Sequence, residues 1–392
     1  MKFNKAFFDE IIDRTQSNSV KWGNRDIMPE DGIPLWVADM DFRCAPAIKE
    51  ALVKRAKHPV YGYTMVIDEC YNSLIGFWER HHNVNINKED LIMLPSVVSG
   101  LRICVNVLTE PNDKVLLLTP IYRPFYSAIE DSGRTISEIV MERDENNRYV
   151  LDLEKLEERL SQGIKLFMLC NPHNPVSRPW SKEELSAMAA LCKKYNVRLA
   201  VDEIHCDFVF PPHEFVSILS IEEAAKNTIA MTSNSKTFNI AGLKQAWLIC
   251  RDKDTLDKIE KYKFAQGIEA GNIFAMEANM AAYNHGDDWL KGLLKYLQGN
   301  QKTLKKFVEE ELPKAKLSPM EATYLAWLDI SAYETDNDVL AKRFYENGVA
   351  VNSGTMFGEL TGKGFIRINY ACPEKNLIKG LKRLKKALIN QK

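Results

Sequence analysis

The middle of the chain alternates short apolar runs with longer amphipathic segments. The short runs have the length of buried strands, and the segments between them have the spacing of helices that cover a sheet. The apolar runs span residues 114–119, 166–170, 198–201, 228–232 and 246–250. This alternation predicts an α/β fold in which a mostly parallel sheet lies between helices.

The segment between the second and third runs carries the signals of a helix start. Ser181 stands three residues before Glu184, which is the spacing of a reciprocal amino-terminal cap, and the first turn is acidic. We expect this helix to continue to about Tyr195. The runs at 166–170 and 198–201 then become the two strands of one βαβ unit.

The last hundred residues show a different pattern of predicted helices and strands. A helix is expected over 290–312, short strands near 324–329 and 364–369, and a basic closing helix over 375–390. We predict a large domain at 48–285 and a smaller α+β domain formed by 1–47 and 286–392. The basic run in the closing helix is interpreted as its solvated face rather than as a nucleic-acid patch.

Composition indicates an ordinary globular enzyme. The chain has 392 residues, of which 45% are hydrophobic and 27% charged, with a formal net charge of -1. A near-neutral balance gives no electrostatic reason to expect nucleic acid or an anionic membrane as a partner. Small molecules are therefore the expected ligands.

Cysteine usage and the amino terminus indicate the compartment. The eight cysteines form no CxxC pair and several lie in apolar runs, so we expect reduced core thiols and no metal site. The first ten residues lack the apolar core of a signal peptide, and no run approaches the ~18 apolar residues of a membrane span. A cytoplasmic protein is predicted.

Lys236 is the most informative single residue. It lies in a polar turn directly behind the apolar segment 227–232, at the carboxyl end of a predicted strand, where α/β folds place their sites. A lysine amine has an unperturbed pKa near ~10.4, so it becomes a useful nucleophile only through desolvation or Schiff-base formation. Taken alone, it could equally be a solvated loop lysine.

Several motifs together resemble a known enzyme superfamily. Their order is similar to that of fold-type I pyridoxal-phosphate (PLP) enzymes, at residues 171–175, 202–205, 233–236 and 365–369. Within this superfamily, the chain resembles the MalY/PatB branch of cystathionine β-lyases at residues 36–42, 61–64, 202–205 and 236–239. Each motif alone is a weak signal, but the set spans nearly the whole chain. The resemblance implies the fold-type I transferase fold and PLP as cofactor.

The resemblance assigns the chemistry to Lys236 and Asp202. The Lys236 amine condenses with the cofactor aldehyde and shuttles the substrate's α-proton. Asp202 faces the pyridine nitrogen and keeps it protonated, so that the ring draws electrons from the developing carbanion. A strand-end cap or a surface acid is the alternative for Asp202. Its neighbour Glu203 points to the opposite face of the strand and is expected to be a bystander.

Three further side chains are expected around the cofactor ring. Asn174 resembles the asparagine that hydrogen-bonds the ring oxygen, and the bond from Asn174 to Pro175 is either cis or part of a plain turn. Tyr122 matches the aromatic residue that stacks on the ring, with a generic core aromatic as the alternative. His205 either approaches the cofactor oxygen or fills space behind it.

The cofactor phosphate is expected at a helix amino terminus, where unpaired amides favour an anion. The resemblance supplies backbone amides and hydroxyls at Ser96, Val97, Val98, Ser233 and Ser235. Tyr63 matches a catalytic tyrosine that such enzymes send from the partner subunit to the phosphate, which implies a homodimer with shared active sites. Lys244 is either a point-charge phosphate ligand or an exposed strand-edge lysine.

Substrate recognition is expected at Arg367, which resembles the arginine that grips the α-carboxylate in a bidentate pair. A structural salt bridge is the alternative. Tyr324, Trp36 and Val37 are expected in the substrate wall, or else in the core. Ser177 departs from the family pattern, which commonly has glycine there; if that position needs a positive φ, a serine is strained.

The predicted activity is an α,β-elimination. L-cystathionine and other L-cysteine S-conjugates, the expected amino-acid thioether substrates, would give a thiol, pyruvate and ammonia, which makes the protein a carbon–sulfur lyase. An aminotransferase is the first alternative, because the fold does not settle the reaction type. A regulatory binding protein of the MalY type with residual lyase activity is the second.

Overall fold

The computed structural model describes residues 2–224, 226–268 and 271–389, and a seven-stranded sheet forms its centre. The strand order is β2-β10-β9-β8-β7-β3-β4. Only β10 runs against its neighbours, so the predicted mostly parallel sheet is confirmed. The strands are β2 (Leu91–Leu94), β3 (Lys114–Thr119), β4 (Thr135–Val140), β7 (Ile164–Cys170), β8 (Arg198–Asp202), β9 (Thr228–Thr232) and β10 (Ala246–Cys250).

Helices cover both faces of this sheet, which explains why its central strands are continuous apolar runs. One face carries α5 (Val97–Leu108), α6 (Arg123–Glu130) and α10 (Lys253–Ala265), and the other α7 (Leu153–Ser161) and α8 (Lys182–Lys194). The helix expected after Ser181 is α8. Its capping box is formed, with the Glu184 amide donating to Ser181 Oγ at 3.2 Å.

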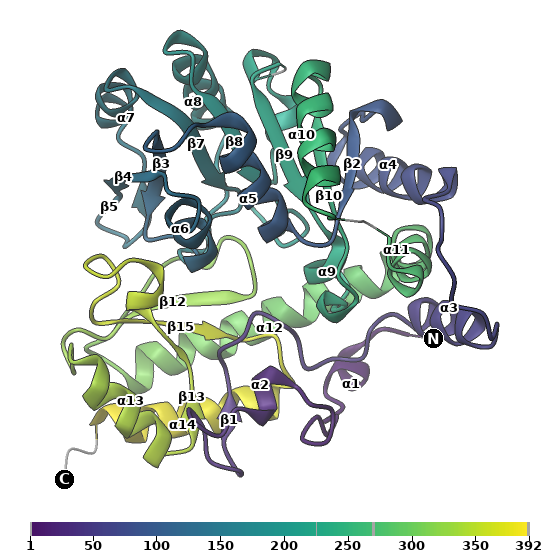
Figure 1. Ribbon diagram of the computed structural model, residues 1–392. Coiled ribbons are helices and arrows are strands. Elements are labelled where there is room, and N and C mark those ends of the chain that lie inside the picture. Colours follow the sequence, from purple (N-terminus) through teal and green to yellow (C-terminus); the bar gives the residue numbers. More distant parts are fainter. Residues whose placement is uncertain (1, 225, 269–270, 390–392) are drawn as a thin grey trace.

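A second, four-stranded sheet lies in the carboxyl-terminal part, in the order β11-β12-β15-β14. Figure 1 shows α12 running below the large sheet towards α13 and α14. The expected strands and helices are all present; residue 390, the predicted end of the closing helix, lies outside the described residues. The elements are α12 (Asp287–Glu311), β11 (Lys316–Leu317), β12 (Leu325–Asp329), α13 (Asn337–Glu346), β14 (Asn352–Ser353), β15 (Phe365–Asn369) and α14 (Glu374–Ile389).

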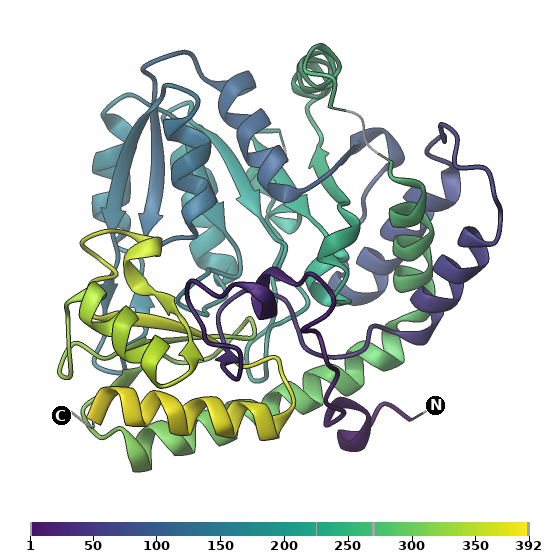
Figure 2. The same cartoon turned by 60° about the horizontal axis from the view of Figure 1, so that its bottom comes forward.

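The amino-terminal segment joins this smaller sheet region. Strand β1 (Ile33–Pro34) pairs in parallel with β13 (Val349–Ala350), and the segment around it passes between the large sheet and the carboxyl-terminal elements (Figure 2). This pairing supports our proposal that 1–47 and 286–392 form one domain. The remaining elements are α1 (Lys5–Phe8), α2 (Val20–Gly23), α3 (Pro46–Ala56), α4 (Asp68–His82), β5 (Glu142–Arg143), β6 (Tyr149–Val150), α9 (Asn234–Thr237) and α11 (Ile273–His285).

All eight cysteines are free thiols. Seven are buried, as expected of core residues, while Cys44 is half-buried. Among the helices that the structure describes, none combines the length and the apolar character needed to cross a membrane.

Candidate active site

The predicted site residues meet at one edge of the large sheet. Asp202 ends β8, Lys236 follows β9, and Tyr122 follows β3, so parallel strands deliver all three to the same edge. A cavity of about 140 Å³ opens there. It is lined by every predicted cofactor-binding residue except Tyr63, namely Ser96, Val97, Val98, Tyr122, Asn174, Asp202, His205, Ser233, Ser235, Lys236 and Lys244.

Lys236 lies on the single turn of α9, which begins behind Ser233. The Ser233 hydroxyl accepts from the Ser235 amide at 3.1 Å and donates to the Gln245 carbonyl at 2.6 Å, so it fixes the start of the turn. The Lys236 amine donates to the carbonyl oxygen of Ala38 at 2.5 Å. Burial, and then the charge of Arg367, lower the pKa of Lys236 to about 8. A reactive neutral amine is thus populated close to neutral pH.

This lowered pKa predicts how fast the cofactor-free protein takes up PLP. Only the neutral amine attacks an aldehyde, so the rate of covalent attachment should rise with pH and level off above about pH 8, the pKa of Lys236. Stopped-flow absorbance after mixing the cofactor-free protein with PLP measures this rate. A rate that still climbs towards pH 10, as for a solvated lysine, would contradict the buried setting.

Asp202 presents a buried carboxylate to the cavity. Its Oδ1 accepts from the Ile204 amide at 2.9 Å. Burial raises the pKa of Asp202 to about 7, although the Ile204 amide and the Lys236 charge oppose that rise. A cation beside it would hold this carboxylate ionised. Glu203 faces away from the cavity and binds Ser217 and the Ile218 amide, as expected of a bystander.

His205 lines the cavity and packs against Tyr324. Its ring lies 5.9 Å from the Tyr324 ring in an edge-on arrangement, and its Nδ1 finds no hydrogen-bond partner within the described residues. Burial lowers the pKa of His205 well below its usual value, with the charges of Lys236 and Arg367 acting in the same direction. A neutral imidazole with an unpaired nitrogen can thus meet a polar group of a ligand, and both predicted roles stay open.

The start of α5 has the character of an anion site. Ser96 caps the helix by accepting from the Ser99 amide at 3.1 Å. The amides of Val97 and Val98 precede it in the first turn, where a helix offers no carbonyl partners. Lys244 lines the same cavity from an exposed position. Gln245, which the sequence did not indicate, also lines it, and its buried side-chain amide has no partner in the described chain.

Arg367 lies on β15 and is 3% exposed. It donates to the side-chain oxygens of Asn174 at 3.0 Å and Asn352 at 2.7 Å and to the Trp36 carbonyl at 3.2 Å. Burial lowers the pKa of Arg367 to about 10. Across the described residues it forms no ion pair, so the alternative of a structural salt bridge is not supported. A buried guanidinium without a counter-charge suits an anionic ligand.

Residues 36–42, here called the N-terminal strap, run past the cavity, and Ala38 lines it. The Asn369 side chain donates to the carbonyls of Val37 and Asp39, at 2.5 and 2.7 Å. The Tyr324 hydroxyl donates to Ala38 at 3.0 Å, beside Lys236. Tyr324, Trp36 and Val37 therefore lie next to the site. Trp36 contacts Arg367, and Val37 contacts Asn369, through backbone carbonyls.

The loop after β7 takes the first of the two conformations that its sequence left open. The bond from Asn174 to Pro175 is cis. Ser177 has a φ of 59°, so the position does require the left-handed region. The serine hydroxyl is buried and contacts Thr323 Oγ1 at 2.8 Å and the Leu325 carbonyl. Those bonds offset the strain that serine carries in place of glycine.

Tyr63 is the one predicted cofactor-binding residue outside the cavity. It is 104% exposed in the connection between α3 and α4, and its own chain does not bring it to the site. A role at the phosphate therefore requires a second subunit.

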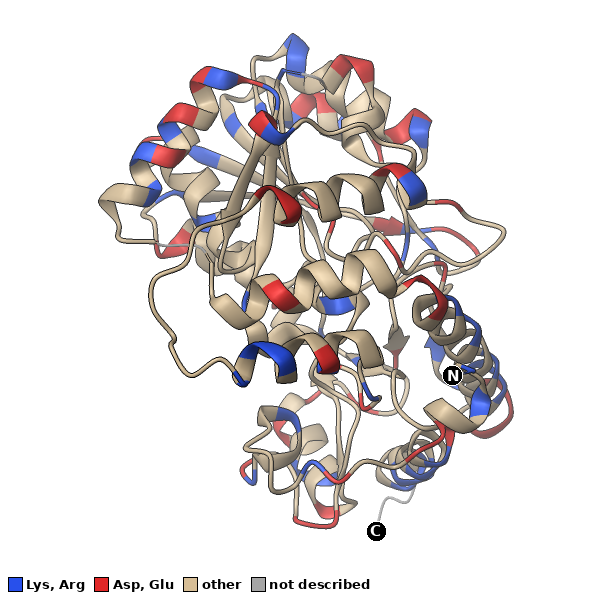
Figure 3. Ribbon diagram, turned by 90° about the vertical axis from the view of Figure 1, so that its right-hand side faces the viewer, with Lys and Arg blue, Asp and Glu red and all other residues tan. Residues whose placement is uncertain are grey.

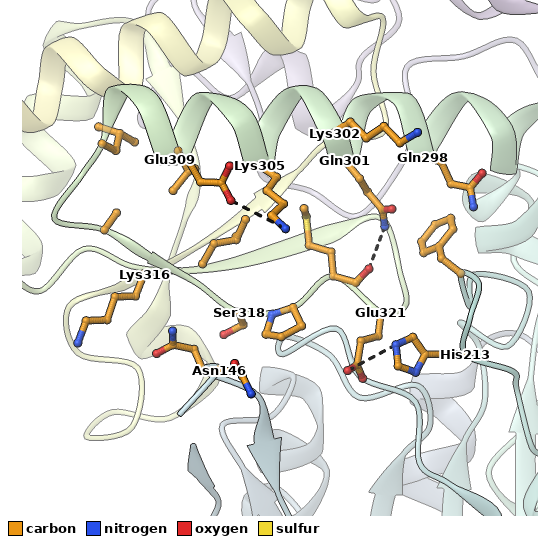
Figure 4. A pocket seen from close by; sticks show the side chains of 18 of the residues that line it. Asn146, His213, Gln298, Gln301, Lys302, Lys305, Glu309, Lys316, Ser318 and Glu321 are labelled. Carbon is orange, nitrogen blue, oxygen red and sulfur yellow. Dashed lines mark hydrogen bonds and ion pairs between the residues drawn. The ribbon is translucent and has the colours of Figure 1, made fainter. Parts of the chain in front are cut away.

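A larger cavity of about 950 Å³ lies elsewhere, between α12 and the segment 316–321. Figure 4 shows surface side chains of α12, such as Lys305 and Glu309, on one side and the pair His213 and Glu321 on the other. None of the predicted site residues lines it. The charged groups that α12 brings to it, Lys302, Lys305 and Glu309, are exposed, so we place the active site in the smaller cavity.

Comparison with known proteins agrees with this geometry. The model of the family "Aminotransferase class I and II" matches residues 30–384. The chain belongs to this family.

Three relatives place this aminotransferase class I and II member more finely. The chain is 38% identical to cystathionine beta-lyase PatB of Bacillus subtilis, over 97% of this chain and 99% of the relative. Its fold matches crystal structures of PLP-containing cystalysin from Treponema denticola (TM-score 0.94, 32% identity, 98% and 99% coverage) and of a PLP-bound C-S lyase from Staphylococcus hominis (TM-score 0.91, 33% identity, 98% of each chain).

The residues of the cavity fit the cofactor of such enzymes. An amine, a carboxylate that a cation would hold ionised, a neutral imidazole and a helix amino terminus face one space. The unpaired side-chain atoms of His205, Gln245 and Arg367 leave polar groups for a ligand to satisfy.

Proposed function

We infer that this protein is a PLP-dependent carbon–sulfur β-lyase, which cleaves L-cystathionine and other L-cysteine S-conjugates to a thiol, pyruvate and ammonia. The observation that carries this inference is the convergence of Lys236 and Asp202 on one cavity, next to Arg367, which binds the lining residue Asn174 and has no acidic partner in the described chain. Relatives and structural neighbours named cystathionine beta-lyase, cystalysin and C-S lyase support it.

The cavity residues divide the work of holding the cofactor. Bound PLP supplies an electron-withdrawing ring to the α-carbon of an amino acid. Lys236 would hold the cofactor aldehyde, and Asp202 would hold the proton on the ring nitrogen. Tyr122 would stack on the ring. The first amides of α5, at Ser96, Val97 and Val98, would hold the phosphate together with Lys244.

The substrate would enter beside the N-terminal strap. Arg367 would exchange its contacts with neutral oxygens for the substrate carboxylate, a stronger charge-assisted pair. This contact would orient the amino acid with its α-proton towards the Lys236 amine, which would accept that proton and release it later. Tyr324, Trp36 and Val37 would limit the space around the sulfur substituent.

We also propose a homodimer in which Tyr63 reaches the phosphate of the partner subunit's site. The connection that carries Tyr63 exposes further apolar residues, namely Val60, Tyr61, Met65 and Ile67. Beside it, α3 and α11 pack against each other, and α11 carries a single acidic residue (Figure 3). Such apolar exposure is typical of a subunit interface. Sedimentation of the cofactor-loaded protein as a monomer would contradict the proposal.

The rival reaction is transamination, since the same cofactor can exchange an amino group for a keto group. Cofactor-loaded protein would be given L-cystathionine together with a keto acid, and pyruvate, thiol and the new amino acid would be quantified. We expect thiol and pyruvate to dominate. If amino-group transfer exceeds thiol release, the protein is an aminotransferase and the lyase proposal is wrong.

A further inference from the structure

Behind the Lys236 turn lies a buried carboxylate that the chemistry above does not use. Asp207 follows Asp202 by five residues, and its Oδ2 accepts from the Thr237 hydroxyl at 2.5 Å. Its Oδ1 lies 2.9 Å from Nε2 of His82, the last residue of α4. The side chains of Asp207 and His82 are only 4% and 5% exposed, and Thr237 is fully buried.

Thr237 is the neighbour of Lys236 on α9, a helix of only four residues. One turn of helix is unstable by itself, so outside contacts must fix the position of the lysine. Within the described chain, hydrogen bonds lie on both sides of it. Ser233 is bound to the Gln245 carbonyl on one side, and Thr237 is bound to Asp207 on the other.

The segment between Asp202 and Asp207 is compact, so it can transmit this constraint. The Cys206 amide donates to the Glu203 carbonyl at 3.0 Å, and the Phe208 amide donates to the His205 carbonyl at 2.9 Å. The carboxylate that faces the cofactor ring and the carboxylate that holds the lysine turn therefore belong to one short, internally bonded segment.

The charge of Asp207 strengthens its hold. Burial raises the pKa of Asp207, but its contacts with His82 and Thr237 outweigh this and keep the pKa below its usual range. An ionised acceptor makes shorter and stronger hydrogen bonds than a neutral one. Breaking the Thr237 contact would leave a buried carboxylate oxygen without a donor. This cost keeps the Lys236 turn in its position.

We propose that Asp207 is a positioning residue that ties the Lys236 turn, through Thr237, to the segment carrying Asp202. The tether sets the spacing between the amine and the carboxylate that act on opposite parts of one cofactor. His82, on α4, lies beside the second oxygen of Asp207. The proposal rests on the proposed function for its catalytic consequence, but not for its structural one.

Cys206 gives this cluster the donor types of a metal site, because its thiol, the His82 imidazole and the Asp207 carboxylate lie within 4.8 Å of one another. Oδ2 of Asp207 already accepts from a hydroxyl on the lysine turn, however, and Oδ1 lies 2.9 Å from Nε2 of His82. The contacts favour a tether over a metal ligand, and the test includes both.

Thr237→Val tests the tether, because valine keeps the shape and removes the hydroxyl, whereas Thr237→Ser keeps the donor. In cofactor-free protein we expect Thr237→Val to speed amide hydrogen exchange across 234–240 by about tenfold or more and Thr237→Ser to restore protection. In loaded enzyme, kcat should fall about 10- to 100-fold with KM nearly unchanged, because positioning is lost but binding is not.

Two further variants keep the outcome decisive. Cys206→Ser should leave both readouts unchanged. If Thr237→Val does not fold, Asp207→Asn, which keeps the shape but removes the charge and one of the two acceptor oxygens, should still speed exchange across 234–240. Three results would each overturn the tether. Exchange could be unchanged in the folded variants, or Thr237→Ser could fail to restore protection. The protein could also bind one equivalent of zinc that is lost in Cys206→Ser. Absence of lyase activity in the wild type would refute the proposed function alone, since the exchange readout needs no cofactor.

Discussion

Replacing Lys236 with alanine should lower the release of pyruvate from L-cystathionine by at least about 10³-fold. One amine both holds the cofactor and moves the α-proton, so the substitution removes two functions that act as a unit. Steady-state assays of pyruvate measure the loss. Mass spectrometry after borohydride reduction should find the cofactor on the peptide containing Lys236 in the wild type and on no peptide in the variant.

A matched control comes from Lys253, a lysine on α10 whose side chain is 85% exposed. Lys253→Ala should retain wild-type turnover and the covalent label. If Lys236→Ala keeps more than about a tenth of the activity, or if the label sits on another lysine, the assignment of the central residue is wrong.

Arg367→Lys should lower kcat/KM for L-cysteine S-conjugates by about 10²- to 10³-fold, chiefly through KM. Arginine offers a planar pair of donors to a carboxylate, and lysine offers a point charge on a different stem. The wild-type guanidinium is already held in place by Asn174 and Asn352, so its orientation is prepared before substrate binds. Saturation kinetics with L-cystathionine give the two constants.

A substrate analogue without the carboxylate separates recognition from general damage. The wild type should strongly prefer an L-cysteine S-conjugate to its decarboxylated amine, and Arg367→Lys should lose most of that preference. Arg143 is a suitable control, because its guanidinium pairs with Asp329 at 2.9 Å within the protein. Arg143→Lys should keep the preference. If Arg367→Lys also keeps it, Arg367 does not bind the substrate carboxylate.

The strands that position the site could be predicted from sequence because they are short, apolar and buried on both faces. Residues 228–232 behave in this way, and the polar turn behind them had to place Lys236 at the sheet edge. Strands β2 and β4 were missed: β2 is an apolar run of only four residues, and β4 lies at the sheet edge with exposed positions at Thr135, Glu138 and Val140. A half-exposed edge strand lacks the continuous apolar run that marks the central strands.

The contacts that bring distant segments to the site could not be predicted. The carbonyl of Ala38 meets Lys236 across nearly two hundred residues of chain, and no periodicity encodes that approach. The same holds for Asp207 and Thr237, whose residue types are ordinary at any strand end or turn. Gln245 gave no signal beyond its place beside Lys244. The family resemblance identified the reactive side chains. The residues that hold those side chains in position could be identified only from the folded structure.

The central claim is tested most directly by the stoichiometry of the wild-type reaction. PLP-loaded protein would be mixed with L-cystathionine, and homocysteine, pyruvate and ammonia would be measured in the same samples over time. A carbon–sulfur β-lyase predicts that the three products appear in equal amounts and at the same rate. No homocysteine, or homocysteine without matching pyruvate, would contradict it.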